Sequence, residues 1–202
     1  WETVIVDDYF PVLGDDYKDT KCNGAAMAYT SNFEELWVPL VEKAFAKYYG
    51  SYAALETGFP HFGLQDLTGG EAEHISIGSA SRGAAKELFW QKIKKYKYNK
   101  YLLGAGTVSS DSADKEILDS GLVFGMTYVI LRVIEVDGLR LLELRNPPGD
   151  HGEWKGDWGD QSKLWTRRLK KKLGWSDNED DGCFFMSFAD FCQSFRTLYV
   201  GR

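Results

Sequence analysis

Cysteine is scarce in this chain: three occur among 202 residues, at Cys22, Cys183 and Cys192. No two of them form a Cys-x-x-Cys pair, which argues against a structural zinc site. An odd, widely spaced set also argues against a disulfide framework. We therefore expect a reducing compartment and ordinary thiols at all three positions.

Long apolar runs are also lacking, and none is long enough to span a membrane. No basic segment followed by an apolar one indicates a secretory signal. The net charge of −6 argues against a general nucleic-acid binder. Basic residues nevertheless cluster from Lys92 to Lys100 and from Arg167 to Lys172. We interpret both clusters as solvated helix faces, and a partner surface or an acidic-lipid patch is the alternative.

Hydrophobic and aromatic residues are plentiful, at 44% and 15% of the chain, with seven tryptophans. This composition can bury a substantial core and argues against a disordered chain. The length fits one domain, or one lobe of a larger one. Because the first residue is Trp1 rather than Met, we expect the chain to be a piece of a longer protein.

Apolar residues recur at helical spacing in four places. The clearest helix carries an apolar stripe from Phe33 to Tyr48, with Asn32 as its cap and Gly50 as its stop. The stripe predicts core packing. Three further helices are predicted over 81–96, capped by Ser81 with Leu88 on its apolar side, over 161–173, with Leu164 buried, and from Ser187 onward.

Strand patterns dominate the region between the second and third predicted helices. Gly125 to Val136 is rich in β-branched residues, Asp137-Gly138 favours a tight turn, and Leu139 to Leu144 returns. Further strands are predicted at Thr3 to Val6 and Thr197 to Val200. The whole pattern predicts an α+β fold, with helices flanking an antiparallel β core.

Four local patterns occur in order along the chain. They are Leu40 to Lys47 followed by Gly50-Ser51-Tyr52, then Asp66-Leu67-Thr68-Gly69-Gly70, then Leu144-Arg145-Asn146-Pro147 followed by Trp154-Lys155-Gly156-Asp157-Trp158, and finally Asp180-Asp181-Gly182 with Phe184 to Phe191. Together they resemble the calpain family of cysteine proteases. Four patterns in register are far more specific than one motif.

The resemblance implies a papain-like core of two lobes, in which the first supplies a nucleophilic Cys and the second a His and an Asn. Residues 1–202 resemble the second lobe, for which we expect two small sheets or a partial barrel flanked by helices. No segment resembles the family's Cys-bearing motif. The expected partners are proteins or peptides, including another lobe of the same polypeptide.

The catalytic histidine of the family follows a Gly and lies two residues before a Tyr. Here that stretch reads Gly125-Met126-Thr127-Tyr128, so Met126 takes the histidine position. A thioether has no titratable proton and cannot act as acid or base. Asn146 matches the family's catalytic Asn, but Pro148 replaces the Trp that follows the Asn-Pro pair in the family.

The remaining histidines are His61, His74 and His151. We interpret the first two as structural residues near the Thr-Gly-Gly segment. His151 is the one substitute that lies near Asn146 in sequence, and a solvated loop histidine is the preferred interpretation.

The resemblance also implies a calcium site built from two loops, with Glu153 and Asp160 in the first and Glu179 and Asp181 in the second. Glu179 would offer its main-chain carbonyl. Cys183 takes the place of a family carboxylate, and a thiol is a poor ligand for calcium. The alternative interpretation is an acidic surface loop.

The sequence thus favours a catalytically inactive calpain-like lobe that binds a peptide or partner or acts as a scaffold. One alternative is a calcium-dependent cysteine endopeptidase whose Cys lies in an absent lobe. The other is a calcium-responsive switch without catalysis. The resemblance implies a cytoplasmic location, with the cytoskeleton as an attachment site in some family members.

Overall fold

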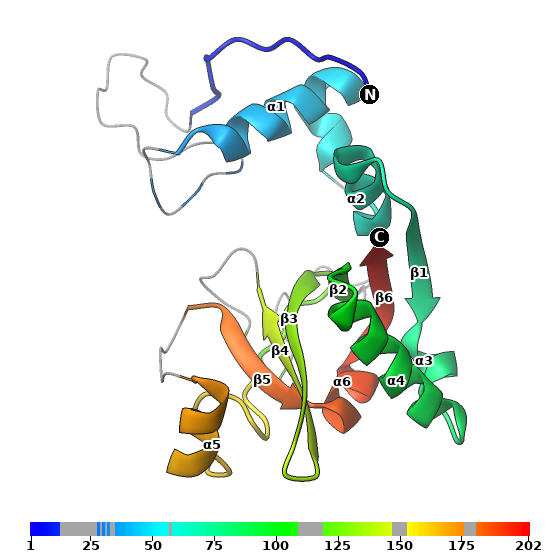
Figure 1. Ribbon diagram of the computed structural model, residues 1–202. Coiled ribbons are helices and arrows are strands. Elements are labelled where there is room, and N and C mark those ends of the chain that lie inside the picture. Colours follow the sequence, from blue (N-terminus) through cyan, green and yellow to red (C-terminus); the bar gives the residue numbers. More distant parts are fainter. Residues whose placement is uncertain are drawn as a thin grey trace. The chain divides into compact units, whose positions relative to one another are not determined.

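The structure, a computed structural model, describes residues 1–12, 28, 30, 32, 35–56, 58–108, 119–146, 153–175 and 181–202 (Figure 1). Cys22, His151 and Glu179 lie outside the described residues, so the predictions made for them stay predictions. The chain divides into two compact units, Trp1–Phe59 and Pro60–Arg202, and each is considered by itself. The assignment of residues 1–202 to a single lobe likewise stays a prediction.

The first unit contains α1 (Trp37–Tyr49) and a short 3₁₀ helix, η1 (Tyr52–Leu55). Gly50 ends α1 in the left-handed conformation, at φ 103°, as the sequence predicted. Asn32 is not the helix cap, because α1 begins only at Trp37. The Glu35 N–H instead donates to the Asn32 carbonyl in a separate turn.

The apolar stripe of α1 is not a core stripe in this unit. Trp37 is 63% exposed, and Val41 and Tyr48 are also exposed, whereas Pro39 and Ala46 are buried. The described residues of the unit include no strand, and the one predicted over Thr3 to Val6 is absent. Among the described residues of this unit no sheet lies beside α1 to cover the stripe, which is why it stays exposed here.

The second unit is built on one open antiparallel sheet, which Figure 1 shows with its strands side by side. The strand order is β1-β6-β2-β3-β4-β5. The strands are β1 (Ala72–Ser76), β2 (Leu102–Thr107), β3 (Thr127–Val136), β4 (Leu139–Arg145), β5 (Cys183–Ser187) and β6 (Phe195–Gly201). The α+β prediction is confirmed, but the strands form one sheet rather than two small sheets or a partial barrel.

Five helices accompany this sheet among the described residues: α2 (Pro60–Thr68), α3 (Ile77–Ala80), α4 (Ala85–Tyr98), α5 (Arg167–Leu173) and α6 (Phe188–Ser194). The helix predicted to start near Ser187 is confirmed as α6, and Ser187 caps it, because its hydroxyl accepts from the Asp190 N–H. Thr166 caps α5 in the same way, so that helix begins later than predicted. Ser81 is not a cap, since α4 begins at Ala85.

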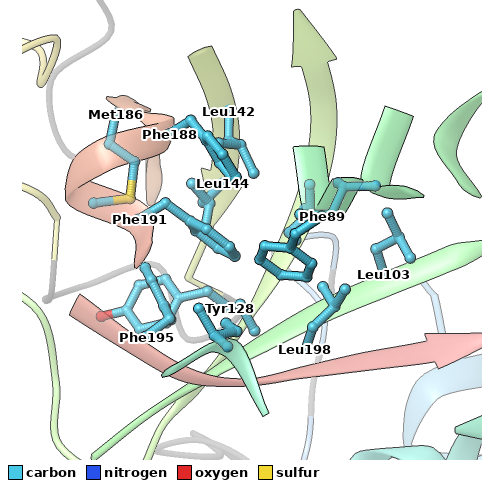
Figure 2. Packing of buried hydrophobic residues seen from close by; sticks show 14 of the residues in the cluster. Phe89, Leu103, Tyr128, Leu142, Leu144, Met186, Phe188, Phe191, Phe195 and Leu198 are labelled. Atoms are coloured by element: carbon cyan, nitrogen blue, oxygen red, sulfur yellow. The ribbon is translucent and has the colours of Figure 1, made fainter. Parts of the chain in front are cut away.

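The larger hydrophobic cluster lies between one face of the sheet and the helices α3, α4 and α6. Figure 2 shows Phe89 of α4, Phe188 and Phe191 of α6, and the sheet residues Tyr128 and Leu144 converging on it. The pattern misplaced Leu88, which is 72% exposed, whereas Trp90, two positions further on, is fully buried.

A second cluster covers the opposite face at the β4–β5 edge. Its buried members come from the sheet, from the 153–160 segment and from α5: Val136, Leu141, Trp158, Leu169, Leu173 and Phe185. Trp165 and Trp175 pack against it. Leu164 was expected to be buried but is exposed, because it precedes the first turn of α5.

A bulge in β3 changes which side chains of this strand face each cluster. The β3–β4 register shifts between Ile130 and Arg132. Before the shift, the even-numbered Tyr128 and Ile130 face the larger cluster; after it, the even-numbered Val136 faces the second. One extra residue reverses the alternation.

Candidate functional site

The two predicted site positions lie at the same end of the sheet. Met126 directly precedes β3 and Asn146 directly follows β4, and these strands pair with Val129 opposite Arg145. If the strand alternation continues by one residue, Asn146 lies on the same face of the sheet as Leu144, which belongs to the larger cluster. The Asp137-Gly138 turn, with φ 50° and 80°, closes the hairpin at the opposite end, as predicted.

Thr107, the last residue of β2, holds the main chain of Met126 on both sides. Its Oγ1 accepts from the Met126 N–H at 3.1 Å and donates to the Val123 carbonyl at 2.7 Å. Its own N–H donates to the Met126 carbonyl at 3.0 Å. The backbone at position 126 is thereby fixed, whatever side chain it carries.

The Met126 side chain itself is partly buried and packs against the larger hydrophobic cluster. This is an ordinary environment for a thioether, which fills irregular space in cores and is only a weak acceptor. Nothing at this position can take up or release a proton near neutral pH.

Asn146 is only 1% exposed. Its N–H donates to the carbonyl of Gly182 at 2.7 Å, just before β5. The end of β4 is therefore tied to the beginning of β5 at the position that the motif assigns to the catalytic Asn.

The two described histidines lie elsewhere. His61 of α2 and His74 of β1 have ring centroids 4.9 Å apart, and His61 stacks on Tyr199 of β6. Strand β1 is three strands from β3, about 14 Å at ordinary strand spacing. Burial, and after it the nearby His74, holds the pKa of His61 below its ordinary value. The geometry fits the predicted structural role.

Neither described cysteine has the environment of a nucleophile. Burial is the main cause that raises the pKa of the Cys183 thiol to about 11, and the Asp181 carboxylate adds to it. Burial likewise raises the pKa of Cys192 to about 11. Both thiols are therefore protonated at neutral pH, whereas a cysteine nucleophile must be a thiolate.

The first predicted calcium loop is a tightly wound segment around Trp154. The Trp154 indole N–H donates to the Asp157 carbonyl at 2.8 Å. A Cβ on Gly156 would lie 2.2 Å from the Trp154 ring, and one on Gly159 would lie 2.2 Å from the Trp154 carbonyl oxygen. The glycines of the Trp-Lys-Gly-Asp-Trp-Gly run are therefore required by close packing.

Two of the predicted calcium ligands, Glu153 and Asp181, accept main-chain hydrogen bonds. Glu153 Oε1 accepts from the Gly182 N–H at 2.7 Å, and Asp181 Oδ1 accepts from the Cys183 N–H at 2.8 Å. The first of these bonds joins Glu153 to the segment that leads into β5. However, no group of three or more His, Cys, Asp or Glu in the described part of the chain, Asp160 included, is placed to hold a metal ion. Because Glu179 lies outside the described residues, the calcium site stays a prediction.

Sequence reasoning missed two residues that organise this end of the sheet, Thr107 and Gly182. Thr107 lies in Leu102–Thr107, a strand whose Gly-Ala-Gly centre has little strand character. Gly182 was noticed only as part of a motif. Its φ of 77° lies in the region that favours glycine. The glycine itself, directly after two aspartates, was therefore the one signal that the sequence offered.

Within the described residues, no helix combines the length and the apolarity needed to cross a membrane. The family model for calpain family cysteine proteases matches residues 1–202.

Two relatives illustrate the similarity. The chain is 41% identical over 204 residues to the calpain-type cysteine protease DEK1 of Arabidopsis thaliana, covering 100% of this chain and 9% of that protein. It is 33% identical over 221 residues to calpain-5 of Mus musculus, covering 100% of this chain and 33% of that protein. The chain thus spans a third or less of these relatives. The resemblance inferred from the motifs is confirmed: the chain belongs to the calpain family.

Proposed function

We propose that this chain is a calpain-type lobe that binds a peptide or a protein partner without cleaving it. The observation that carries the proposal is Met126, which takes the place of the histidine in the family pattern and packs against the larger hydrophobic cluster. Without an imidazole, a partner thiol is not activated and the leaving amine is not protonated.

The contacts around Met126 and Asn146 support the proposal that the main chain of the site is retained although the catalytic histidine is lost. Thr107 holds the main chain at Met126, and Gly182 holds that at Asn146. A frame of this kind can still present a cleft to an extended peptide, since binding and catalysis need different groups. We include in this proposal that the protein is located in the cytoplasm, together with the other lobes of the same polypeptide.

The test is cleavage of casein by the full-length protein, with calcium and with chelator. We expect no cleavage in either condition, and we expect the protein to bind casein that stays intact. Calcium-stimulated cleavage that disappears when the first-lobe Cys is replaced would overturn the proposal in favour of the endopeptidase.

Met126→His sharpens the test, with Met126→Ala as its matched control. If the first lobe carries a Cys, the histidine variant is expected to gain calcium-dependent cleavage. Loss of a catalytic base costs on the order of 10⁶ in kcat, so even partial restoration is measurable. The alanine variant removes the same thioether and should gain nothing.

The endopeptidase is the second candidate, and the relatives that are called cysteine proteases favour it. The calcium-responsive switch has less support, because Glu153 and Asp181 already accept main-chain hydrogen bonds.

A further inference from the structure

We propose that Glu153 is a positioning residue that fixes both positions of the candidate site, Met126 and Asn146, and that it does so without bound calcium. The inference deepens the proposed function, because it explains how a cleft frame persists where catalysis is lost. It assigns the carboxylate a role inside the protein instead of one on a cation.

The side chain of Glu153 reaches Asn146 through a single residue. Its Oε1 accepts the Gly182 N–H at 2.7 Å, and the Gly182 carbonyl accepts the Asn146 N–H at 2.7 Å. Gly182 is buried and has φ 77°, a backbone conformation that residues with a Cβ rarely adopt. This conformation sets the directions of its N–H and carbonyl. A hydrogen bond to a carboxylate is among the stronger kinds, especially away from water.

The main chain of Glu153 supports the approach to Met126. A Cβ on Gly121 would lie 2.0 Å from the Glu153 carbonyl oxygen, so the two main chains are in direct contact. Next to it, the Lys155 N–H donates to the Ser120 carbonyl at 2.9 Å. The 119–125 segment, which leads into Met126, therefore rests on residues 153–155.

One residue thus touches both segments that define the site. The Gly182 N–H already uses Glu153 Oε1, so a cation drawn to that oxygen would have to share it with this donor. The described acidic residues also form no metal-binding group. Both observations favour an internal brace over a metal ligand.

The test is amide hydrogen exchange by NMR on the 1–202 chain in buffer with chelator. In the wild type, the Gly182 and Asn146 amides are expected to be protected without calcium. Glu153→Ala should accelerate these two amides at least tenfold and leave the β1 and β6 amides unchanged. Glu153→Gln should restore most of the protection, because its amide oxygen can still accept the bond.

Asp157 provides the matched control, because it is an exposed carboxylate in the same tight segment. Asp157→Ala should leave the Gly182 and Asn146 amides as in the wild type. The proposal is overturned if Glu153→Gln exchanges as fast as Glu153→Ala, or if all amides accelerate together.

The wild-type arm keeps the test decisive if Glu153→Ala does not fold. Protection of Gly182 and Asn146 that appears only after millimolar calcium is added would also overturn the proposal. Exchange is measured without any substrate, so failure of the brace and failure of the non-catalytic proposal are separate results.

Discussion

At the scale of single residues, the Tyr128 hydroxyl joins the hydrophobic core to the candidate site. The Tyr128 ring is fully buried and meets the edges of Phe184 and Phe195. Its oxygen accepts the Val123 N–H at 2.9 Å, three residues before Met126. Burial raises the pKa of this phenol, so it remains protonated throughout the neutral range.

Tyr128→Phe removes this acceptor and leaves the Val123 N–H without it. We expect the free energy of unfolding to fall by about 1–3 kcal/mol, the cost of an unsatisfied buried donor. Tyr98→Phe is the control: Tyr98 is 87% exposed, and its change should stay within about 0.5 kcal/mol. Urea denaturation measures both, and equal effects would refute the role of the hydroxyl.

Residue identities at the site were predictable where a motif surrounds them, as with Met126 between Gly125 and Tyr128. Thr107 was not, because its partners Val123 and Met126 lie 16 and 19 positions further along the chain. Threonine is common on strands for other reasons, and nothing in the neighbouring sequence indicates that its hydroxyl bonds to the main chain of a distant segment.

At the scale of elements, α2 docks on the sheet through a pair of histidines. His61 of α2 meets His74 of β1 and Tyr199 of β6, and Leu64 packs on Gly201. Because burial and the nearby His74 lower the pKa of His61, the folded state binds fewer protons there than the unfolded chain does. This contribution to stability is present above about pH 6.5 and is lost as pH falls through the folded-state pKa.

We therefore predict that acidification from about pH 7 to about pH 5 destabilises the wild type more than His61→Phe, which keeps an aromatic ring and cannot titrate. His74→Gln is the comparison, since it keeps the buried His61 and should retain more of the pH dependence. Urea denaturation across this range measures both slopes. A His61→Phe slope as steep as that of the wild type would contradict the assignment.

Element ends were predictable where a cap or a stop is local, as at Ser187 and Gly50. The β3 bulge was not, because the run from Gly125 to Val136 is β-branched on both faces of the strand. Such a run indicates a strand and does not indicate where the faces exchange. The change of faces becomes visible only when the two clusters on either side of β3 are known.

At the scale of the molecule, the second unit contains every described part of the sheet and both hydrophobic clusters. Both clusters are thus formed among described residues of this unit alone, as expected of a part that folds by itself. The two-unit division was not visible in the sequence. Only Gly58 and Pro60 flank the boundary at Phe59, which is too little to indicate a linker, and the apolar stripe of α1 is typical of a core helix.

We predict that residues 60–202, produced alone, unfold in one cooperative transition and keep the antiparallel sheet. Circular dichroism during urea denaturation measures the transition, and exchange of the β2, β3 and β6 amides reports the sheet. A broad, non-cooperative loss of signal would show that the first unit is needed for folding.

The second cluster has an optical consequence. The Trp165 and Trp175 rings lie 6.0 Å apart at 22°, and Trp158 meets Trp165 edge-on at 5.2 Å. Indole chromophores held this close in fixed, unequal orientations couple their excited states. Near-ultraviolet dichroism of these indoles therefore offers a built-in signal for the docking of α5, read without any label.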